Sequence, residues 1–173
     1  MEKVKKKYNK KGFISIYTIL WIIVLLPLLM FVTIDFTHFM HVNNQLKNLT
    51  DNLSASAVTL LDEDEIPKGI LTVKESDAKD MVNKMLKDEL KLKDDLTPTD
   101  KSILRSAPDV EVKVVNEVPS AGIDVSLKTG DVVNIKNPSV IVSVDYPIRG
   151  LFYNKLTIHY KKIGTSQVQF LNK

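Results

Sequence analysis

The histidines and one nearby acidic residue are the side chains best suited to chemistry. Asp35, His38 and His41 follow one another at steps of three, just after a long apolar stretch. On a helix this spacing lets adjacent members share a face, but the outer two point in well-separated directions. One helix therefore offers a metal ion two of these ligands, not three, and we predict no metal site. We interpret the three as polar residues at a membrane interface, and place His159 on the polar side of a strand.

Motifs of known catalytic machinery are missing from the sequence. It contains no Gly-rich phosphate loop, no His-Glu-x-x-His motif and no Gly-x-Ser-x-Gly elbow. It also contains no cysteine, which excludes disulfides, thiolate metal sites and a cysteine nucleophile. We therefore predict a non-enzymatic protein with no catalytic residues and no cofactor.

The longest apolar stretch, residues 13–34, contains no charged residue. About 20 residues rising about 1.5 Å each cross a hydrocarbon core of about 30 Å. A helix is the expected state because lipid offers the backbone no hydrogen-bond partners. Pro27 lies inside the stretch and removes one helical hydrogen bond, so we predict a kink there. The sequence thus predicts one transmembrane helix in a lipid bilayer.

Charges on the two sides of this stretch predict its orientation. Residues 1–12 form a basic leader with six lysines against one glutamate, and Asp35 is the first charge on the far side. The positive-inside rule then places the N-terminus in the cytoplasm and residues 35–173 outside, as a single-pass cell-membrane protein with an extracellular or cell-surface domain. Without the leader, 18 basic and 20 acidic residues remain, a net charge of −2 that does not favour nucleic acid as a partner.

A helical pattern continues beyond the membrane, over residues 35–61, without glycine or proline. Its apolar stripe consists of residues at spacings of three, four or seven, namely Phe39, Val42, Leu46, Leu49, Leu53 and Leu60. Much of the other face is polar, namely Asn43, Asn44, Lys47, Asn48, Asp51 and Asn52. We therefore expect one helix to leave the bilayer and continue outside it.

Residues 62–173 predict an extracytoplasmic α+β domain. A second helix is expected over residues 75–92, and alternating apolar and polar residues begin at Asp109. The expected strands contain Val110–Val114, Ile123–Leu127, Val132–Ile135, Val140–Tyr146 and Leu156–Tyr160, with Val168 and Phe170 near the end. Pro147 is expected to end the clearest of them. Because such strands have one apolar face, we predict a small antiparallel sheet.

Three short segments, in this order, resemble the TadE/TadG-like pseudopilins of tight-adherence pili. They are Lys11-Gly12-Phe13 before the apolar helix, Leu26-Pro27-Leu28-Leu29 within it and Ile34-Asp35-Phe36 at its end. The Asn- and Ala-bearing helix over residues 44–57 is also similar, so the resemblance covers residues 10–58 and is only schematic beyond them. It implies a pilin-like fold and a role in assembling a bacterial pilus or secretion filament, with other pilin-like subunits and assembly machinery as partners.

The resemblance also implies a processing site between Gly12 and Phe13. Prepilin peptidases cut after a glycine that follows basic residues, and glycine leaves the backbone unshielded. The family usually has glutamate at the fifth residue after the cut, where its carboxylate can meet the N-terminal amine of a neighbouring subunit. Tyr17 occupies that position here, and a neutral phenol cannot offset the burial of an ammonium group in lipid.

Three alternatives remain open at this stage. If Gly12 only separates the basic leader from a signal anchor, the chain is an unprocessed extracytoplasmic binding or sensor module. An anchored hydrolase acting through paired carboxylates is the next alternative. The letters Ala55-Ser56-Ala57 also fit a signal peptidase, which would make Val58 the first residue, although they lie about twenty residues beyond the apolar run.

Overall fold

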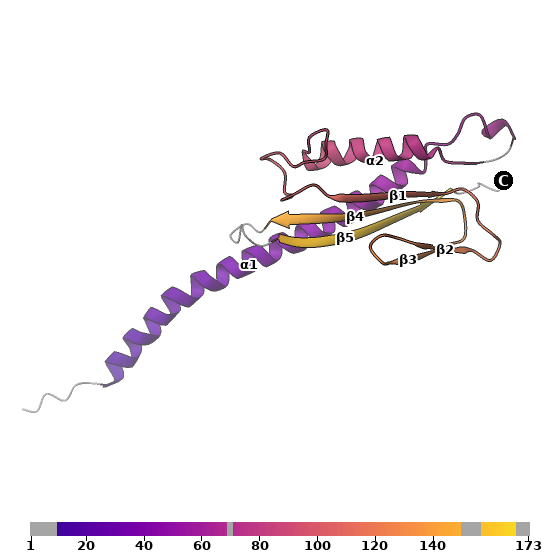
Figure 1. The fold of residues 1–173 in the computed structure, drawn as a ribbon. Coiled ribbons are helices and arrows are strands. Elements are labelled where there is room, and N and C mark those ends of the chain that lie inside the picture. The colour runs from indigo at the N-terminus through magenta and orange to yellow at the C-terminus, as the bar shows by residue number, and fades with distance from the viewer. Residues whose placement is uncertain (1–9, 69–70, 150–156, 169–173) are drawn as a thin grey trace, which may run out of the picture. The chain divides into compact units, whose positions relative to one another are not determined.

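The computed structural model describes residues 10–68, 71–149 and 157–168, with side chains from residue 16 onwards. The elements follow one another as α1 (Lys10–Ala57), the short 3-10 helix η1 (Ile66–Lys68), α2 (Glu75–Leu90), β1 (Asp109–Val115), β2 (Ile123–Ser126), β3 (Val132–Ile135), β4 (Ser139–Arg149) and β5 (Thr157–Gln167) (Figure 1). The architecture is α+β, as predicted. The chain divides into two compact units, Met1–Phe39 and Met40–Lys173.

The first unit consists of the N-terminal part of α1. Its large apolar side chains between Ile16 and Phe36 are 44–65% exposed. A contiguous apolar surface of this size belongs in lipid or against another protein. The helix is long and apolar enough to cross a membrane once, in agreement with the predicted single span.

The second unit begins with the C-terminal part of α1, which ends at Ala57, four residues before the predicted end at Leu61. The chain turns there because Leu61 forms a bridge with Val73, and the amide of Asp62 donates to the carbonyl of Thr72 at 2.8 Å. These contacts replace the last helical hydrogen bonds that the sequence pattern had suggested.

The main sheet has the order β1-β4-β5, with both pairs antiparallel, and β2 and β3 form a separate antiparallel pair. Its central strand, β4, was expected to be half-buried because polar residues alternate with valines. That expectation is wrong: Ser139 and Ser143 are as buried as their apolar neighbours. The β2–β3 hairpin covers this face of the strand. Ile141, which lies on the same face as the two serines, packs with Leu127 and Ile135 of the hairpin.

Pro147 does not end β4, which continues to Arg149. The carbonyl of Pro147 accepts a hydrogen bond from the amide of Arg105 at 2.8 Å. In a strand, the N–H and C=O of one residue point to the same side, so the missing N–H of Pro147 also faces Arg105. The β1 ladder has already ended there, at the pair of Asp109 with Asp145. A proline is tolerated at this position because it interrupts no ladder hydrogen bond.

The second helix, α2, stops at Leu90, two residues before the predicted end. Its buried residues recur every four positions and are Ala78, Val82, Leu86 and Leu90. Lys91 then adopts a left-handed conformation with φ of 54°, and the amide of Leu92 donates back to Lys87. This turn is a standard helix ending, and α2 packs beside β1 (Figure 1).

A glycine of β5 lets α1 approach the sheet very closely. A Cβ atom added at Gly164 would lie 2.4 Å from the carbonyl oxygen of Thr50 and 3.0 Å from Oγ of Ser54. The obstacle is helix backbone, which cannot turn aside as a flexible side chain would. The separation between α1 and β5 is therefore set by the missing side chain at Gly164.

Replacing this glycine by alanine should destabilise the second unit. We expect Gly164→Ala to lower the free energy of unfolding by about 1–3 kcal/mol, because the helix must move away from the strand. Urea unfolding of the full-length chain in detergent, followed by circular dichroism, measures the loss. Thr165→Ala is the matched control, since Thr165 is the exposed neighbour on the same strand. Equal stability of the two variants would contradict the close contact.

Candidate functional site

The predicted processing site lies at the beginning of α1. Because the helix starts at Lys10, Gly12 and Phe13 belong to its first turn. The first four amides of a helix have no intrahelical partner, and glycine favours helix less than other residues except proline. Glycine therefore makes this turn less costly to open than most other residues would. The side chains of residues 10–15 lie outside the described part of the structure.

Tyr17 lies in the first unit, with 55% of its surface exposed. The side chain here is a phenol, where the family usually has a carboxylate. Processing and assembly at this position would have to proceed without the charge pair that glutamate provides.

Helix α1 continues through Pro27 as one element, and the kink expected there remains a prediction.

Two threonines follow within the same unit. Thr33 Oγ1 donates to the carbonyl of Leu29 at 2.7 Å, and Thr37 Oγ1 donates to the carbonyl of Thr33 at 2.8 Å. Both hydroxyls are thus satisfied within the helix and need no partner in lipid.

Asp35, the predicted membrane-exit residue, is half-buried. One of its carboxylate oxygens is buried and has no hydrogen-bond partner in the described part of the chain. His38 is also half-buried, with its ring 6.1 Å from that of Phe39, and His41 is exposed. Among residues 10–68, 71–149 and 157–168, no three acidic or histidine side chains are grouped to hold a metal ion.

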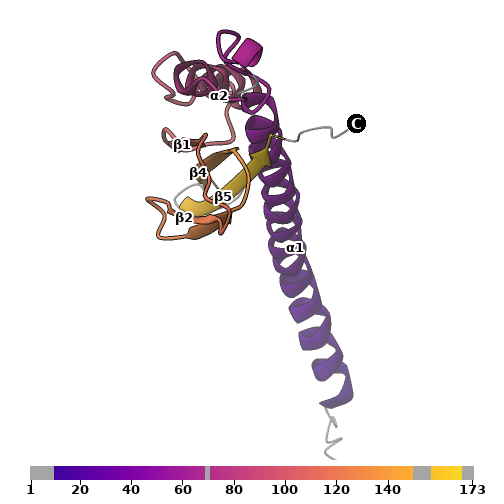
Figure 2. The same ribbon diagram turned by 90° about the vertical axis from the view of Figure 1, so that its right-hand side faces the viewer.

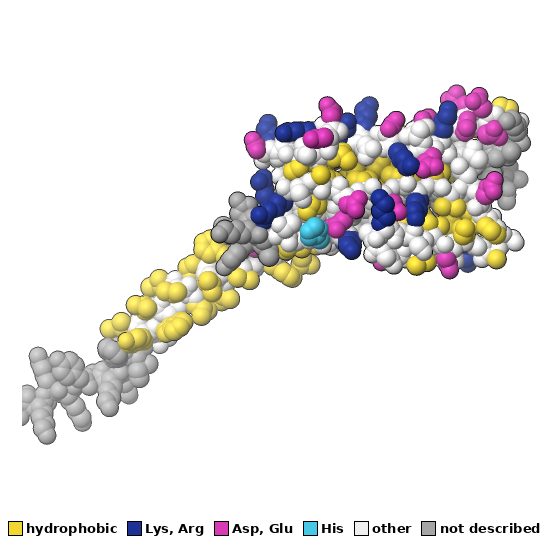
Figure 3. Space-filling view, in the orientation of Figure 1, with side chains coloured by type: hydrophobic (Ala, Val, Ile, Leu, Met, Phe, Trp, Pro, Cys, Tyr) yellow, Lys and Arg dark blue, Asp and Glu magenta, His cyan; other side chains and the backbone are white. Residues whose placement is uncertain are grey.

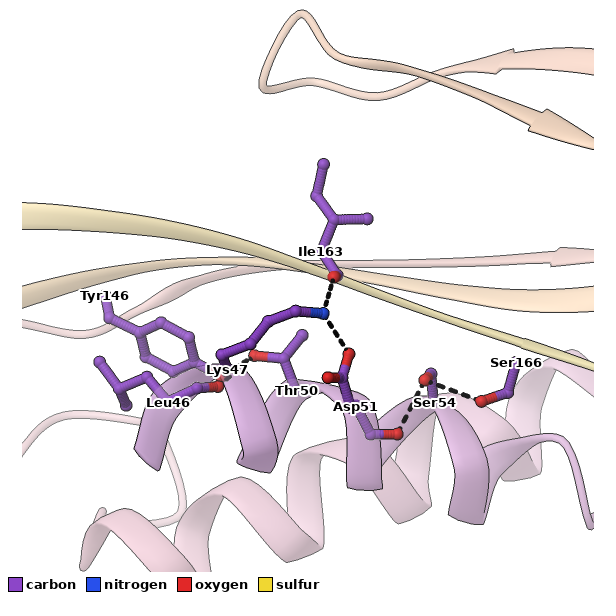
Figure 4. A network of polar contacts seen from close by, with 8 residues as sticks. All are labelled: Leu46, Lys47, Thr50, Asp51, Ser54, Tyr146, Ile163 and Ser166. Atoms are coloured by element: carbon purple, nitrogen blue, oxygen red, sulfur yellow. Dashed lines mark hydrogen bonds and ion pairs between the residues drawn. The ribbon is translucent and has the colours of Figure 1, made fainter. Parts of the chain in front are cut away.

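A row of polar contacts joins α1 to β5 (Figure 4). Lys47 Nζ donates to the carbonyl of Ile163 at 3.0 Å while pairing with Asp51, as Figure 4 shows. Outside that view, Lys162 Nζ donates to Asn43 Oδ1 at 2.5 Å. The sequence pattern assigned Asn43, Lys47 and Asp51 to the polar face that points away from the core. Lys47 is exposed, as this assignment predicts, but its ammonium and the carboxamide of half-buried Asn43 also reach β5, a contact that the pattern did not identify.

Further along the same row, hydroxyl groups lie where the pattern predicted only apolar contacts. Thr50 and Ser54 are both fully buried. Ser54 Oγ lies 2.9 Å from the carbonyl of Asp51, to which it donates, and 3.0 Å from Ser166 Oγ. A weak signal existed in the sequence, since Lys47, Thr50 and Ser54 recur at helical spacing beside the apolar stripe.

The buried phenol of Tyr146 completes this contact. Its hydroxyl lies 2.9 Å from Thr50 Oγ1, which itself donates to the carbonyl of Leu46 at 2.8 Å, so Tyr146 is the donor (Figure 4). Burial raises the pKa of the Tyr146 phenol to about 12, against a smaller opposite effect of the contact with Thr50. The phenol therefore stays protonated at any physiological pH.

His159 lies on the sheet surface, as predicted, but with a partner that the pattern did not identify. Its Nδ1 is 3.2 Å from both carboxylate oxygens of Asp145. The two residues are diagonal neighbours, because Asp145 pairs with Lys161 and His159 with Pro147. Alternation along a strand cannot reveal such a pair without the register of β4 and β5.

Charged side chains of both signs are intermingled on the face of the second unit seen in Figure 3. The described part of the first unit is covered mainly by hydrophobic side chains. The visible face thus carries no extended field of one sign of the kind that binds nucleic acid.

Comparisons of the chain with protein-family models, with curated proteins and with solved structures found no match. The function is therefore argued from the residues of this chain.

The raised pKa of Tyr146 predicts a loss of stability at alkaline pH. The phenol ionises near pH 10 in the unfolded chain but only near pH 12 in the folded chain, so its contribution is complete below pH 10 and is lost as the pH rises to about 12. A shift of this size corresponds to about 2–3 kcal/mol. Urea unfolding at pH 8 and at pH 11–12 should show this decline in the parent chain.

Tyr146→Phe isolates this effect from any other change in the chain at alkaline pH. The variant should lose about 1 kcal/mol at pH 8 with the hydroxyl contact to Thr50. Its stability should then fall less steeply with alkaline pH than that of the parent. Parallel pH profiles for the two proteins would contradict the assignment.

Proposed function

We propose that this chain is a non-enzymatic, pilin-like membrane subunit, a pseudopilin that takes part in assembling a bacterial pilus or secretion filament. Its partners are the lipid bilayer, other pilin-like subunits and the assembly machinery. Its role is structural: the apolar helix packs laterally, and the α+β domain is presented outside the cell.

The observation that carries this proposal is the dual use of α1. One helical element, Lys10–Ala57, supplies the candidate membrane span and also packs against an antiparallel sheet at Gly164. A module that is merely tethered needs only a linker between its anchor and its domain. A helix shared by both suits a subunit whose helix is the packing element of an assembly.

The proposed orientation follows from charge. The basic leader, residues 1–12, would stay in the cytoplasm, and the domain that follows Asp35 would face outwards. A prepilin peptidase would then meet the Gly12–Phe13 bond on the cytoplasmic side of the membrane, in the first turn of α1.

Tyr17 favours a second candidate function. Without a carboxylate at this position, the chain is equally suited to remain a signal-anchored extracytoplasmic binding or sensor module. Such a module would keep its leader and would not enter a filament.

The mass of the mature protein separates these two functions. We expect the full-length chain, made together with a prepilin peptidase, to begin at Phe13, and the chain made without the peptidase to keep residues 1–12. Intact-mass spectrometry of the membrane fraction measures the difference. Gly12→Val should block the cut because the β-branched side chain shields the scissile bond, whereas Ser15→Val should not.

Each other result has a defined meaning. An uncleaved chain in the presence of an active peptidase would favour the binding module. A protein that begins at Val58 would contradict both functions, because the membrane helix would then be a discarded signal.

A further inference from the structure

Five residues of α1 form an exposed and uncharged stripe, hereafter the carboxamide stripe. They are His41, Gln45, Asn48, Asn52 and Ala55, and all are exposed. Their spacing of four, three, four and three keeps them within an arc of about 80° at 100° per residue. This is the spacing at which two helices pack side by side over successive heptads.

The stripe lies opposite the surface by which α1 joins its own domain. The buried residues Val42, Leu46, Thr50 and Ser54 face the core and β5. In Figure 2 the sheet lies on one side of the C-terminal part of α1, and no described element covers the other side. In the described part of the chain, the stripe residues are exposed and do not belong to the core.

The stripe differs from an ordinary solvent-facing helix surface. The exposed face of α2 is charged, with Lys79, Asp80, Lys84 and Asp88. On the stripe, by contrast, polarity comes mainly from carboxamides, although the sequence as a whole is 26% charged. Exclusion of charge from an exposed surface is typical of the core of a protein interface.

A groove lined by both polar and apolar side chains borders the stripe along one flank. It has a volume of about 430 Å³ and lies between α1 and α2. Leu49, Met85 and Ile103 contribute apolar surface, and Gln45, Asn48 and Asn52 of the stripe form part of its wall. The far wall also carries charged side chains, namely Glu89, Lys91 and Lys101. A partner helix on the stripe would therefore also cover half-exposed apolar side chains, whose burial is favourable.

The composition of the stripe selects its partner. Each carboxamide has both donors and an acceptor, so a row of them can pair with an identical row, whereas charged rows of one sign would repel each other. Ala55 is small enough to allow two helices to approach closely. Copies anchored by the same apolar helix also enter the membrane in the same orientation, which favours parallel pairing.

We propose that the carboxamide stripe is the surface on which a second copy of this chain packs, stripe against stripe and parallel. This inference rests on the proposed function for its premise that copies of the chain associate, and it adds the surface that they use.

The cysteine-free sequence allows a direct test by single-cysteine cross-linking of the full-length chain in membranes. Asn48→Cys and Asn52→Cys should each give a disulfide-linked dimer on mild oxidation, because like residues face each other in a parallel pair. Asp80→Cys, on the exposed face of α2, is the control and should give at least several-fold less dimer. Equal yields at positions 52 and 80 would overturn the proposal.

A second change tests whether the stripe itself makes the contact. Added to Asn52→Cys, Asn48→Lys places two ammonium groups opposite each other and should reduce the dimer several-fold, whereas Asn48→Gln should preserve it. Insensitivity to the lysine, or a cross-linked product with the mass of a different protein, would also overturn the proposal.

The N-terminal mass of the same samples separates this inference from the proposed function. A dimer that keeps residues 1–12 in the presence of peptidase would support the stripe and contradict processing. A chain cut at Phe13 with no dimer would contradict the stripe and leave the proposed function standing.

Discussion

The backbone contact between Gly164 and Thr50 is the constraint on which the second unit depends. With no side chain at Gly164, the carbonyl of Thr50 comes close enough that a single methyl group would collide with it. Short hydroxyl side chains fit this separation, and a leucine in their place would not. Thr50 and Ser54 lie in this close contact, where Thr50 Oγ1 meets the hydroxyl of Tyr146 and Ser54 Oγ meets that of Ser166.

This geometry explains why a polar helix face can bury itself. The hydroxyls of Thr50, Ser54 and Tyr146 all have partners, so their burial does not incur the cost of an unsatisfied polar group. Lys47 and Asn43 lie at the edge of the contact, where their polar ends meet β5 while remaining near solvent. The helix is thus attached to the sheet by hydrogen bonds, and it also contributes Val42, Leu46 and Leu53 to the buried core.

Local patterns in the sequence were sufficient for the elements but not for their partners. The uncharged run and the period-two valines predicted the apolar helix and the antiparallel sheet, because both signals are local. The burial of Ser143, the continuation of β4 through Pro147 and the contact of Lys47 with β5 were missed. Each depends on a neighbour distant in sequence: the β2–β3 hairpin, the segment at Arg105 and β5. The candidate processing site was inferred from local sequence alone, and it remains a prediction.

The position of Lys47 has a consequence for solubility outside the membrane. β5 is an edge strand of its sheet, and an open edge invites another strand to add to it and begin aggregation. The carbonyl of Ile163 is already occupied by the Lys47 ammonium, and α1 runs beside the strand at Gly164. Lys47 of α1 therefore occupies one acceptor on this edge, which leaves an incoming strand one hydrogen-bonding group fewer.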